Sequence, residues 1–138
     1  MRVFGIGIDI VETARIKRSM ERFGDKFLDR LFTAREREYC DRMKFSERHY
    51  AARFAAKEAI SKTFGTGIGE HSDWTDLEIL RRETGEPYVV LQGAAKAFAD
   101  KHGITELMIS LSHADDYAAA NAMALCGDGR PKQKEVEG

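Results

Sequence analysis

Residues 3–11 of the chain read VFGIGIDIV, and the alternation within this stretch predicts a β-strand. One face of the strand carries the large apolar side chains Phe4, Ile6, Ile8 and Ile10. The other carries Gly5, Gly7 and Asp9, where missing side chains leave room for a ligand or another chain. A carboxylate ending a strand expected to be buried needs a cation, hydrogen bonds or solvent. Asp9 is therefore a candidate functional residue, the alternative being a cap for the helix near Glu12.

Working outward, the pattern predicts helices in the first half of the chain and strands in the second. Helices are expected at 12–23 (Ile16, Met20 and Phe23 inward), from Thr33 with Glu36 as its capping-box partner, at 47–64 capped by Ser46, and at 93–102. Strands are expected at 76–82, 88–91, 106–112 and 117–125. This order favours an α+β fold in which a mainly antiparallel sheet, joined by the first strand, packs against the long central helix.

Length and composition favour one domain. The chain has 138 residues, of which 43% are apolar and 33% charged, which excludes a disordered tail protein and a membrane span. We expect a domain over 1–126 and a polar, flexible tail over 127–138. There is no signal-peptide pattern, and the isolated Cys40 and Cys126 exclude a zinc ribbon or disulfide scaffold, so a cytoplasmic protein is expected.

Charge is unevenly distributed. Residues 1–62 contain 15 Lys and Arg against 10 Asp and Glu, whereas residues 63–138 contain 7 against 13. A basic half suggests an anionic partner, which could be a nucleic acid, a phosphate-rich cofactor or an acidic protein. The alternative is that helical segments simply carry more Lys and Arg.

Glu58 and Lys62 lie one turn apart on the helix expected at 47–64. They are either an ordinary i,i+4 pair or a metal-binding carboxylate beside a phosphate-binding lysine. Asp9 and Glu58 together, without His or Cys, suit a hard cation such as magnesium that shares its remaining sites with substrate phosphates. Arg53 and Lys57 on the same helix could serve phosphate oxygens.

Two further elements are ambiguous on local sequence. Residues 65–69, GTGIG, are either a helix C-cap with a loop or part of a site. They do not form a P-loop, because no GK[ST] follows, and Ile10 stands where a Rossmann turn needs its third glycine after Gly5 and Gly7. His113 ends a strand, where a lone histidine is more often structural than catalytic.

Taken in order, these motifs resemble the holo-[acyl-carrier-protein] synthase family of small bacterial phosphopantetheinyl transferases. The resemblance rests on GIGIDIVE at 5–12, RFAAKEA at 53–59 with Lys62, GTGIG at 65–69, GEP at 85–87 and SLSH at 110–113 with Tyr117 and Ala118. It covers about residues 4–125 and excludes the tail.

The resemblance implies a magnesium-dependent transfer of 4′-phosphopantetheine from coenzyme A to a serine of apo-acyl carrier protein, supporting fatty acid biosynthesis. Adenosine 3′,5′-bisphosphate is released. Asp9 and Glu58 match the family's magnesium ligands, and Lys62 matches its lysine near the pyrophosphate. Magnesium and Lys62 would neutralise charge as the serine attacks. The base is either Glu58 or a magnesium-bound water.

The family also implies partners. Coenzyme A contacts are expected at Arg53, Lys62, Gly65, Gly67 and His113. The family is a homotrimer with sites between subunits, and its basic first helix docks the acidic carrier protein. The best matches for docking are Arg15, Met20, Arg22, Phe23 and Lys26. No membrane or nucleic-acid partner is expected.

Two alternative functions share part of this pattern. A non-catalytic RNA-binding or adaptor module could use the basic residues of 15–22, but that segment also carries Glu21, and the pI of about 6.4 is low for such a domain. A transferase acting on a carrier domain of a polyketide or peptide synthase would use the same chemistry, and the small size favours the fatty-acid carrier.

Overall fold

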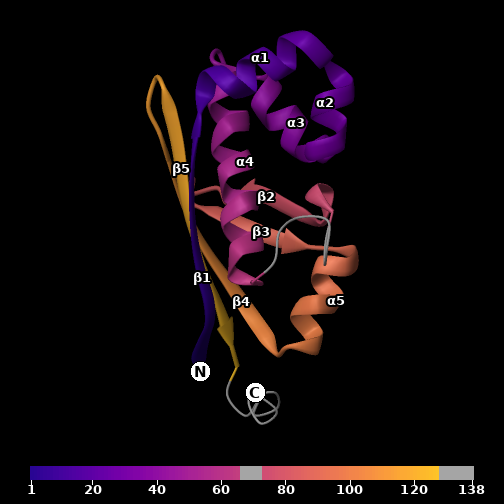
Figure 1. The fold of residues 1–138 in the computed structure, drawn as a ribbon, viewed down its shortest axis with the longest axis vertical. Coiled ribbons are helices and arrows are strands. Elements are labelled where there is room, and N and C mark those ends of the chain that lie inside the picture. Colours follow the sequence, from indigo (N-terminus) through magenta and orange to yellow (C-terminus); the bar gives the residue numbers. More distant parts are fainter. Residues whose placement is uncertain (66–72, 128–138) are drawn as a thin grey trace.

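The computed structural model describes residues 1–65 and 73–127, which form an α+β fold (Figure 1). Its helices are α1 (Thr13–Phe23), α2 (Asp25–Leu31), α3 (Ala34–Asp41), α4 (Ser46–Thr63), the 3-10 turn η1 (Trp74–Asp76) and α5 (Gly93–Lys101). Its strands are β1 (Arg2–Glu12), β2 (Leu77–Arg81), β3 (Pro87–Leu91), β4 (Ile104–His113) and β5 (Tyr117–Cys126). The expected fold class is confirmed. No helix in these two ranges is long and apolar enough to cross a membrane.

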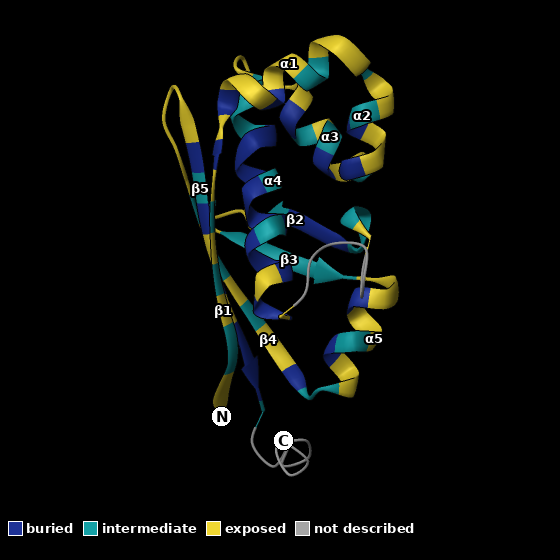
Figure 2. Cartoon of the chain, in the orientation of Figure 1, coloured by how far each residue is buried: buried dark blue, intermediate teal, exposed yellow. Residues whose placement is uncertain are grey.

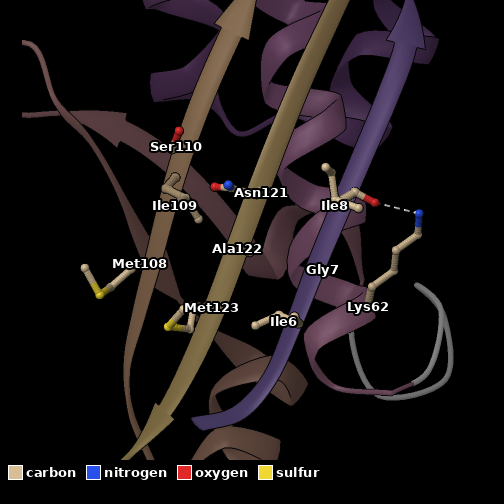
Figure 3. A pocket seen from close by; sticks show the side chains of 10 residues that line it. All are labelled: Ile6, Gly7, Ile8, Lys62, Met108, Ile109, Ser110, Asn121, Ala122 and Met123. Carbon is tan, nitrogen blue, oxygen red and sulfur yellow. Dashed lines mark hydrogen bonds between the residues drawn. The ribbon is translucent and has the colours of Figure 1, made fainter.

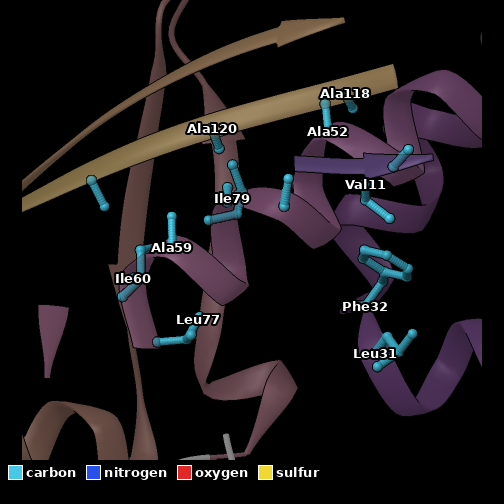
Figure 4. Close-up of a cluster of buried hydrophobic side chains, with 14 of the residues drawn as sticks. Val11, Leu31, Phe32, Ala52, Ala59, Ile60, Leu77, Ile79, Ala118 and Ala120 are labelled. Carbon is cyan, nitrogen blue, oxygen red and sulfur yellow. The ribbon is translucent and has the colours of Figure 1, made fainter. Parts of the chain in front are cut away.

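The strands form two antiparallel sheets, where the sequence suggested one. The larger sheet has the order β1-β5-β4, so β1 and β4 are its edges, and β2 and β3 form a separate hairpin. The central helix α4 lies along one face of the larger sheet (Figure 1). The hairpin stays with the same core because Leu77 and Ile79 bury their side chains in the cluster that contains Ile60 of α4 (Figure 4).

Small side chains let α4 lie close to the sheet. The buried face of β5 carries four alanines, Ala118, Ala120, Ala122 and Ala124, followed by Cys126. The buried stripe of α4 is also rich in alanine, at Ala51, Ala52, Ala55, Ala56 and Ala59. On β1, a Cβ at Gly5 would overlap the carbonyl oxygen of Thr63, and one at Gly7 would overlap that of Ala59. The space expected beside these glycines for a ligand or another chain is therefore filled by the chain's own helix.

The isoleucine face of β1 points away from α4 and is exposed, so the expectation that this strand is buried is wrong for this face. Ile6, Ile8 and Ile10 are 68%, 69% and 66% exposed. Figure 2 shows the contrast with α4, which is mostly buried. Phe4 does not share this face, because the pairing of β1 with β5 shifts between Val3 and Gly5. Its ring instead contacts Phe98 of α5, with centroids 6.3 Å apart.

The helical half follows the sequence in part. The Thr33–Glu36 capping box is present as expected, with each side chain paired to the other residue's backbone N–H. Ser46 is not the cap of α4, because the helix begins at Ser46 itself and Phe45 precedes it without a side-chain hydrogen bond. Phe23 was expected to face inward but is 54% exposed.

Candidate active site

Three charged side chains predicted from the sequence meet where β1 runs beside α4. Lys62 Nζ of α4 lies 3.2 Å from Asp9 Oδ1 of β1 and donates a hydrogen bond of 2.9 Å to the carbonyl oxygen of Ile8. Gly7 makes this possible, because a Cβ there would crowd the Cβ of Lys62. Lys62 therefore bonds to β1. The sequence suggested only an i,i+4 pair with Glu58 and did not predict this contact with the strand.

Glu58 lies within electrostatic reach of the same group. Partial burial raises the pKa of its carboxyl above the ordinary value, and the negative charge of Asp9 raises it further. The positive charges of Lys62 and of Arg15 on α1 act in the opposite direction. The negative charges of the two carboxylates repel each other, and a cation bound between them would offset this repulsion.

Asp9 and Glu58 fit a hard divalent cation. Their donors are carboxylate oxygens, the ligands that Mg²⁺ takes when its other positions hold water and substrate phosphate. Within residues 1–65 and 73–127 there is no group of three or more His, Cys, Asp and Glu side chains placed to hold a metal. The carboxylate pair is thus suited to an ion whose remaining ligands come from outside the protein.

Lys57 does not belong to this site, and the idea that it serves phosphate oxygens is wrong. Its side chain is fully buried on the other side of α4, where Nζ lies 2.9 Å from Glu36 Oε1. It also donates to the backbone oxygens of Trp74 and Leu77. All the hydrogen-bonding capacity of this ammonium is used within the fold.

Arg53 lies in a basic pocket between α3, α4 and the β2–β3 hairpin. The pocket, of about 490 Å³, is lined by Arg35, Glu38, Tyr39, Arg42, Arg53, Leu80, Arg81, Arg82, Gly85 and Tyr88. Arg53 is only 1% exposed, and its Nε donates to the carbonyl oxygen of Ile79. Its buried Nη1 has no hydrogen-bond partner among the described residues. A buried guanidinium with an unused donor, on a residue that lines a pocket, is suited to an anion's oxygen.

His113 lies at the exposed end of β4, on the opposite edge of the larger sheet from Asp9. Its ring contacts that of His49 on α4.

Gly65 follows α4 with φ of +86°, a conformation that favours glycine at a helix end, in agreement with the C-cap interpretation. Gly67 lies outside the described residues.

The residues expected to dock a carrier protein lie on α1 and α2. Arg15, Arg22 and Phe23 are exposed on α1 and line a surface hollow together with Arg18, Ser19 and Glu21. Met20 is half-buried. Lys26 is exposed but lies on α2, because Gly24 at φ of +58° interrupts the helix.

Comparison with known proteins identifies the family to which the chain belongs. Residues 5–122 match the family model described as the 4′-phosphopantetheinyl transferase superfamily. The chain belongs to the 4′-phosphopantetheinyl transferase superfamily. It is 49% identical over 124 residues to the holo-[acyl-carrier-protein] synthase of Ruminiclostridium cellulolyticum, covering 89% of this chain and 92% of that one. A second relative of the same name, from Caldanaerobacter subterraneus, is 46% identical over 93% of this chain and 98% of its own.

Solved structures of phosphopantetheinyl transferases agree. The holo-[acyl-carrier-protein] synthase of Neisseria meningitidis superposes with a TM-score of 0.83 at 32% identity, covering 89% of this chain and 98% of that one. The holo-[acyl-carrier-protein] synthase of Helicobacter pylori, solved in complex with coenzyme A, superposes with a TM-score of 0.78 at 34% identity. The match covers 87% of this chain and 99% of that one. The resemblance stated from the sequence and the assignment of the chain as an enzyme of this family are confirmed.

Sequence reasoning missed part of the basic pocket of this transferase. Arg42, Arg81 and Arg82 join Arg53 there, with Tyr39 between them. Arg42 and Tyr39 lie in or beside α3, whereas Arg81 and Arg82 lie at the end of β2. The signal available in the sequence was the pair of arginines at 81–82, two residues away from the Gly85-Glu86-Pro87 turn.

Proposed function

We propose that the chain transfers the 4′-phosphopantetheine group of coenzyme A to a serine of apo-acyl carrier protein, in a magnesium-dependent reaction supporting fatty acid biosynthesis in the cytoplasm. The products are holo-acyl carrier protein and adenosine 3′,5′-bisphosphate. The observation that carries the proposal is the meeting of Asp9, Glu58 and Lys62 between β1 and α4. The names of the relatives supply the substrates.

The chemistry follows from the charges at this point. A Mg²⁺ ion held by Asp9 and Glu58 would supply positive charge to the diphosphate of coenzyme A. Lys62 places a second cation beside the ion's ligands, held in place by the carbonyl oxygen of Ile8. Its ammonium stabilises the negative charge that develops on the leaving bisphosphate. No protein nucleophile is needed.

The basic pocket supplies a binding place for the remaining phosphate of coenzyme A. We assign Arg53 and His113 to this contact, and Gly65 and Gly67 to the segment beside the diphosphate. Arg53 and Glu58 are five residues apart on α4, which separates them by about 140° around the helix axis. Asp9 and His113 likewise lie on opposite edge strands. One coenzyme molecule therefore reaches both regions most simply where two copies of the chain meet.

A second copy fits the exposed face of the larger sheet. Ile6, Ile8, Met108 and Met123 border a shallow, mainly apolar hollow of about 750 Å³, with Lys62 at its margin (Figure 3). An apolar face of this kind, rimmed by polar groups, is typical of a protein interface. It supports the homotrimer expected from the family, with active sites at the subunit boundaries.

The carrier protein would dock on α1. Its exposed arginines, Arg15 and Arg22 among them, present positive charge to an acidic partner, and Phe23 adds apolar contact. Lys26 extends the positive surface onto α2, and we assign the half-buried Met20 to the apolar part of the same surface. The influence of Arg15 on the pKa of Glu58 indicates that this surface adjoins the carboxylate pair.

The test is a mass-shift assay. Purified protein with Mg²⁺, coenzyme A and apo-acyl carrier protein is expected to add one phosphopantetheine mass to the carrier, and a chelator is expected to abolish the addition until Mg²⁺ is restored. Glu58→Gln should lower the rate by at least about a hundredfold, the scale of losing one charge-stabilising group. Asp100→Asn, which removes an exposed carboxylate on α5, is the matched control. Full activity of Glu58→Gln would contradict the assignment.

A further inference from the structure

Two histidine rings meet between the start of α4 and the end of β4. The ring centroids of His49 and His113 are 5.0 Å apart with an angle of 68° between the planes. His49 is half-buried and His113 is exposed. Tyr39 of α3 packs on the other side of His49, with centroids 5.9 Å apart. Three elements thus hold the pair in place.

The groups that face this pair are mainly cationic. His49 lies within electrostatic reach of Arg53 on α4 and Arg81 on β2, and His113 within reach of Arg48 on α4 and of Arg81. The acidic groups nearby are Glu47 on α4, which acts on His49, and Asp115 in the β4–β5 turn. Asp115 is already paired with Arg48 at 3.3 Å.

Tyr39 joins the histidines to the basic pocket. The guanidinium carbons of Arg42, Arg53 and Arg81 lie 5.6, 4.4 and 5.9 Å from the centroid of its ring. Within this cluster Arg53 Nη1 and Arg81 Nε are buried without a hydrogen-bond partner among the described residues. Buried donors of this kind are costly unless an acceptor completes them. An oxyanion of the ligand would supply that acceptor beside the two rings.

The protein without ligand keeps the pair neutral near pH 7. Burial lowers the pKa of His49 below its usual value, and the positive charges of His113, Arg53 and Arg81 lower it further. Burial, Arg48 and Arg81 likewise lower the pKa of His113. A dianion among these groups offsets the local positive charge and raises both pKa values.

We propose that His49 is a further phosphate-binding residue of this enzyme, paired with His113, and that a phosphomonoester bound there draws one proton from solvent onto the pair. The inference deepens the proposed function, on which it rests, because coenzyme A carries such a group at its 3′-position. The proton moves from water to an imidazole nitrogen, and no bond of the ligand is broken. About one proton is the upper limit, since two neighbouring imidazolium rings repel each other.

Proton uptake sets the sign of the pH dependence. Binding that takes up a proton becomes tighter as pH falls, so affinity for coenzyme A should rise as pH drops from about 8 towards 6.5, the ordinary pKa of histidine. Dephospho-coenzyme A, which lacks the 3′-phosphate, should show no such rise. His49→Gln should weaken binding of coenzyme A about three- to tenfold by removing one charge-assisted hydrogen bond.

Isothermal calorimetry counts the proton directly. Coenzyme A, adenosine 3′,5′-bisphosphate and dephospho-coenzyme A are titrated into the full-length protein at pH 7 and constant Mg²⁺, in two non-phosphate buffers of different ionisation enthalpy. We expect proton uptake with the first two ligands and none with the third. The uptake should be lost in His49→Gln and in His113→Gln, while both variants retain the wild-type melting temperature.

The outcomes separate the two proposals. If coenzyme A binds with the same proton uptake and affinity in His49→Gln as in the wild type, the role of His49 is overturned and the proposed function stands. If neither coenzyme A nor adenosine 3′,5′-bisphosphate binds the wild type, both are overturned. Histidine ring resonances in NMR that shift to higher pKa on adding coenzyme A would support the inference independently.

Discussion

At the scale of single residues, two lysines five positions apart on α4 have opposite roles. Lys62 has a half-exposed side chain, 52% accessible, and points to Asp9. Lys57 is fully buried, and desolvation lowers the pKa of its ammonium, an effect that the charge of Glu36 opposes. Glu36 in turn accepts the backbone N–H groups of Thr33 and Ile79. This one ion pair therefore ties α3, α4 and β2 together around the basic pocket.

Lys57→Met should accordingly reduce the free energy of unfolding by about 3–5 kcal/mol, because it leaves the Glu36 carboxylate buried without its cation. Lys62→Met, which removes the same charge from the same helix, should change it by at most about 1 kcal/mol, since its partner Asp9 is near the surface. Urea unfolding measures both. Combining Lys57→Met with Glu36→Gln should recover part of the loss, and a Lys57→Met protein as stable as the wild type would contradict the account.

At the scale of elements, the site depends on how closely β1 approaches α4. The strand supplies Asp9 and the helix supplies Glu58 and Lys62, and both glycines of β1 lie where a side chain would strike the helix backbone. The same close contact explains the alanine stripe of β5. Glycine and alanine are thus needed here because their small size lets the backbones of strand and helix approach closely, and not because they are flexible.

Gly7→Ala is therefore expected to destabilise the protein by about 1–3 kcal/mol, the usual cost of forcing a group into a packed interior, and to displace Lys62. Thermal unfolding and the transfer assay measure the two effects. Gly127→Ala is the matched control, because an added Cβ there would meet only the Thr105 side chain, at 3.0 Å from its Cγ2, and no backbone atom. Equal melting temperatures for Gly7→Ala and the wild type would show that strand and helix are less tightly packed than described.

At the scale of the whole molecule, the larger sheet has one face covered by α4 and one face open. The open face presents Ile6, Ile8 and Ile10, each about two-thirds exposed, with Met108 and Met123 beside them. Burying an isoleucine side chain stabilises an assembly by about 1.5–3 kcal/mol. Several such side chains on one face favour association between copies, and association would bring the two halves of the proposed coenzyme site together.

Ile8→Glu should consequently shift the protein from the proposed trimer to a monomer and abolish transfer, because a carboxylate would be buried in the proposed interface. Light scattering coupled to size-exclusion chromatography measures the mass. Ala94→Glu, on the exposed side of α5, adds the same charge away from this face and should leave mass and activity unchanged. A trimeric Ile8→Glu protein would show that another surface mediates assembly.

Local sequence determined most of the elements, although it missed the short helix α2, and it determined the chemistry of the candidate site. Alternation in 3–11, the Thr33–Glu36 capping box and the long helical run each act between near neighbours in the chain, so they could be found without the fold. Asp9, Glu58 and Lys62 were selected because their side chains suit a hard cation and phosphate.

Only the tertiary structure decided which face of each element is buried. In the fold, the isoleucines of β1 face outward, whereas Gly5 and Gly7 pack against α4. The fold buried Lys57 while leaving Lys62 free to reach Asp9, and it gathered the basic pocket from α3, α4 and β2. The physical reason is that periodicity shows that two faces differ, whereas burial depends on what packs against them, and those partners are remote in the chain.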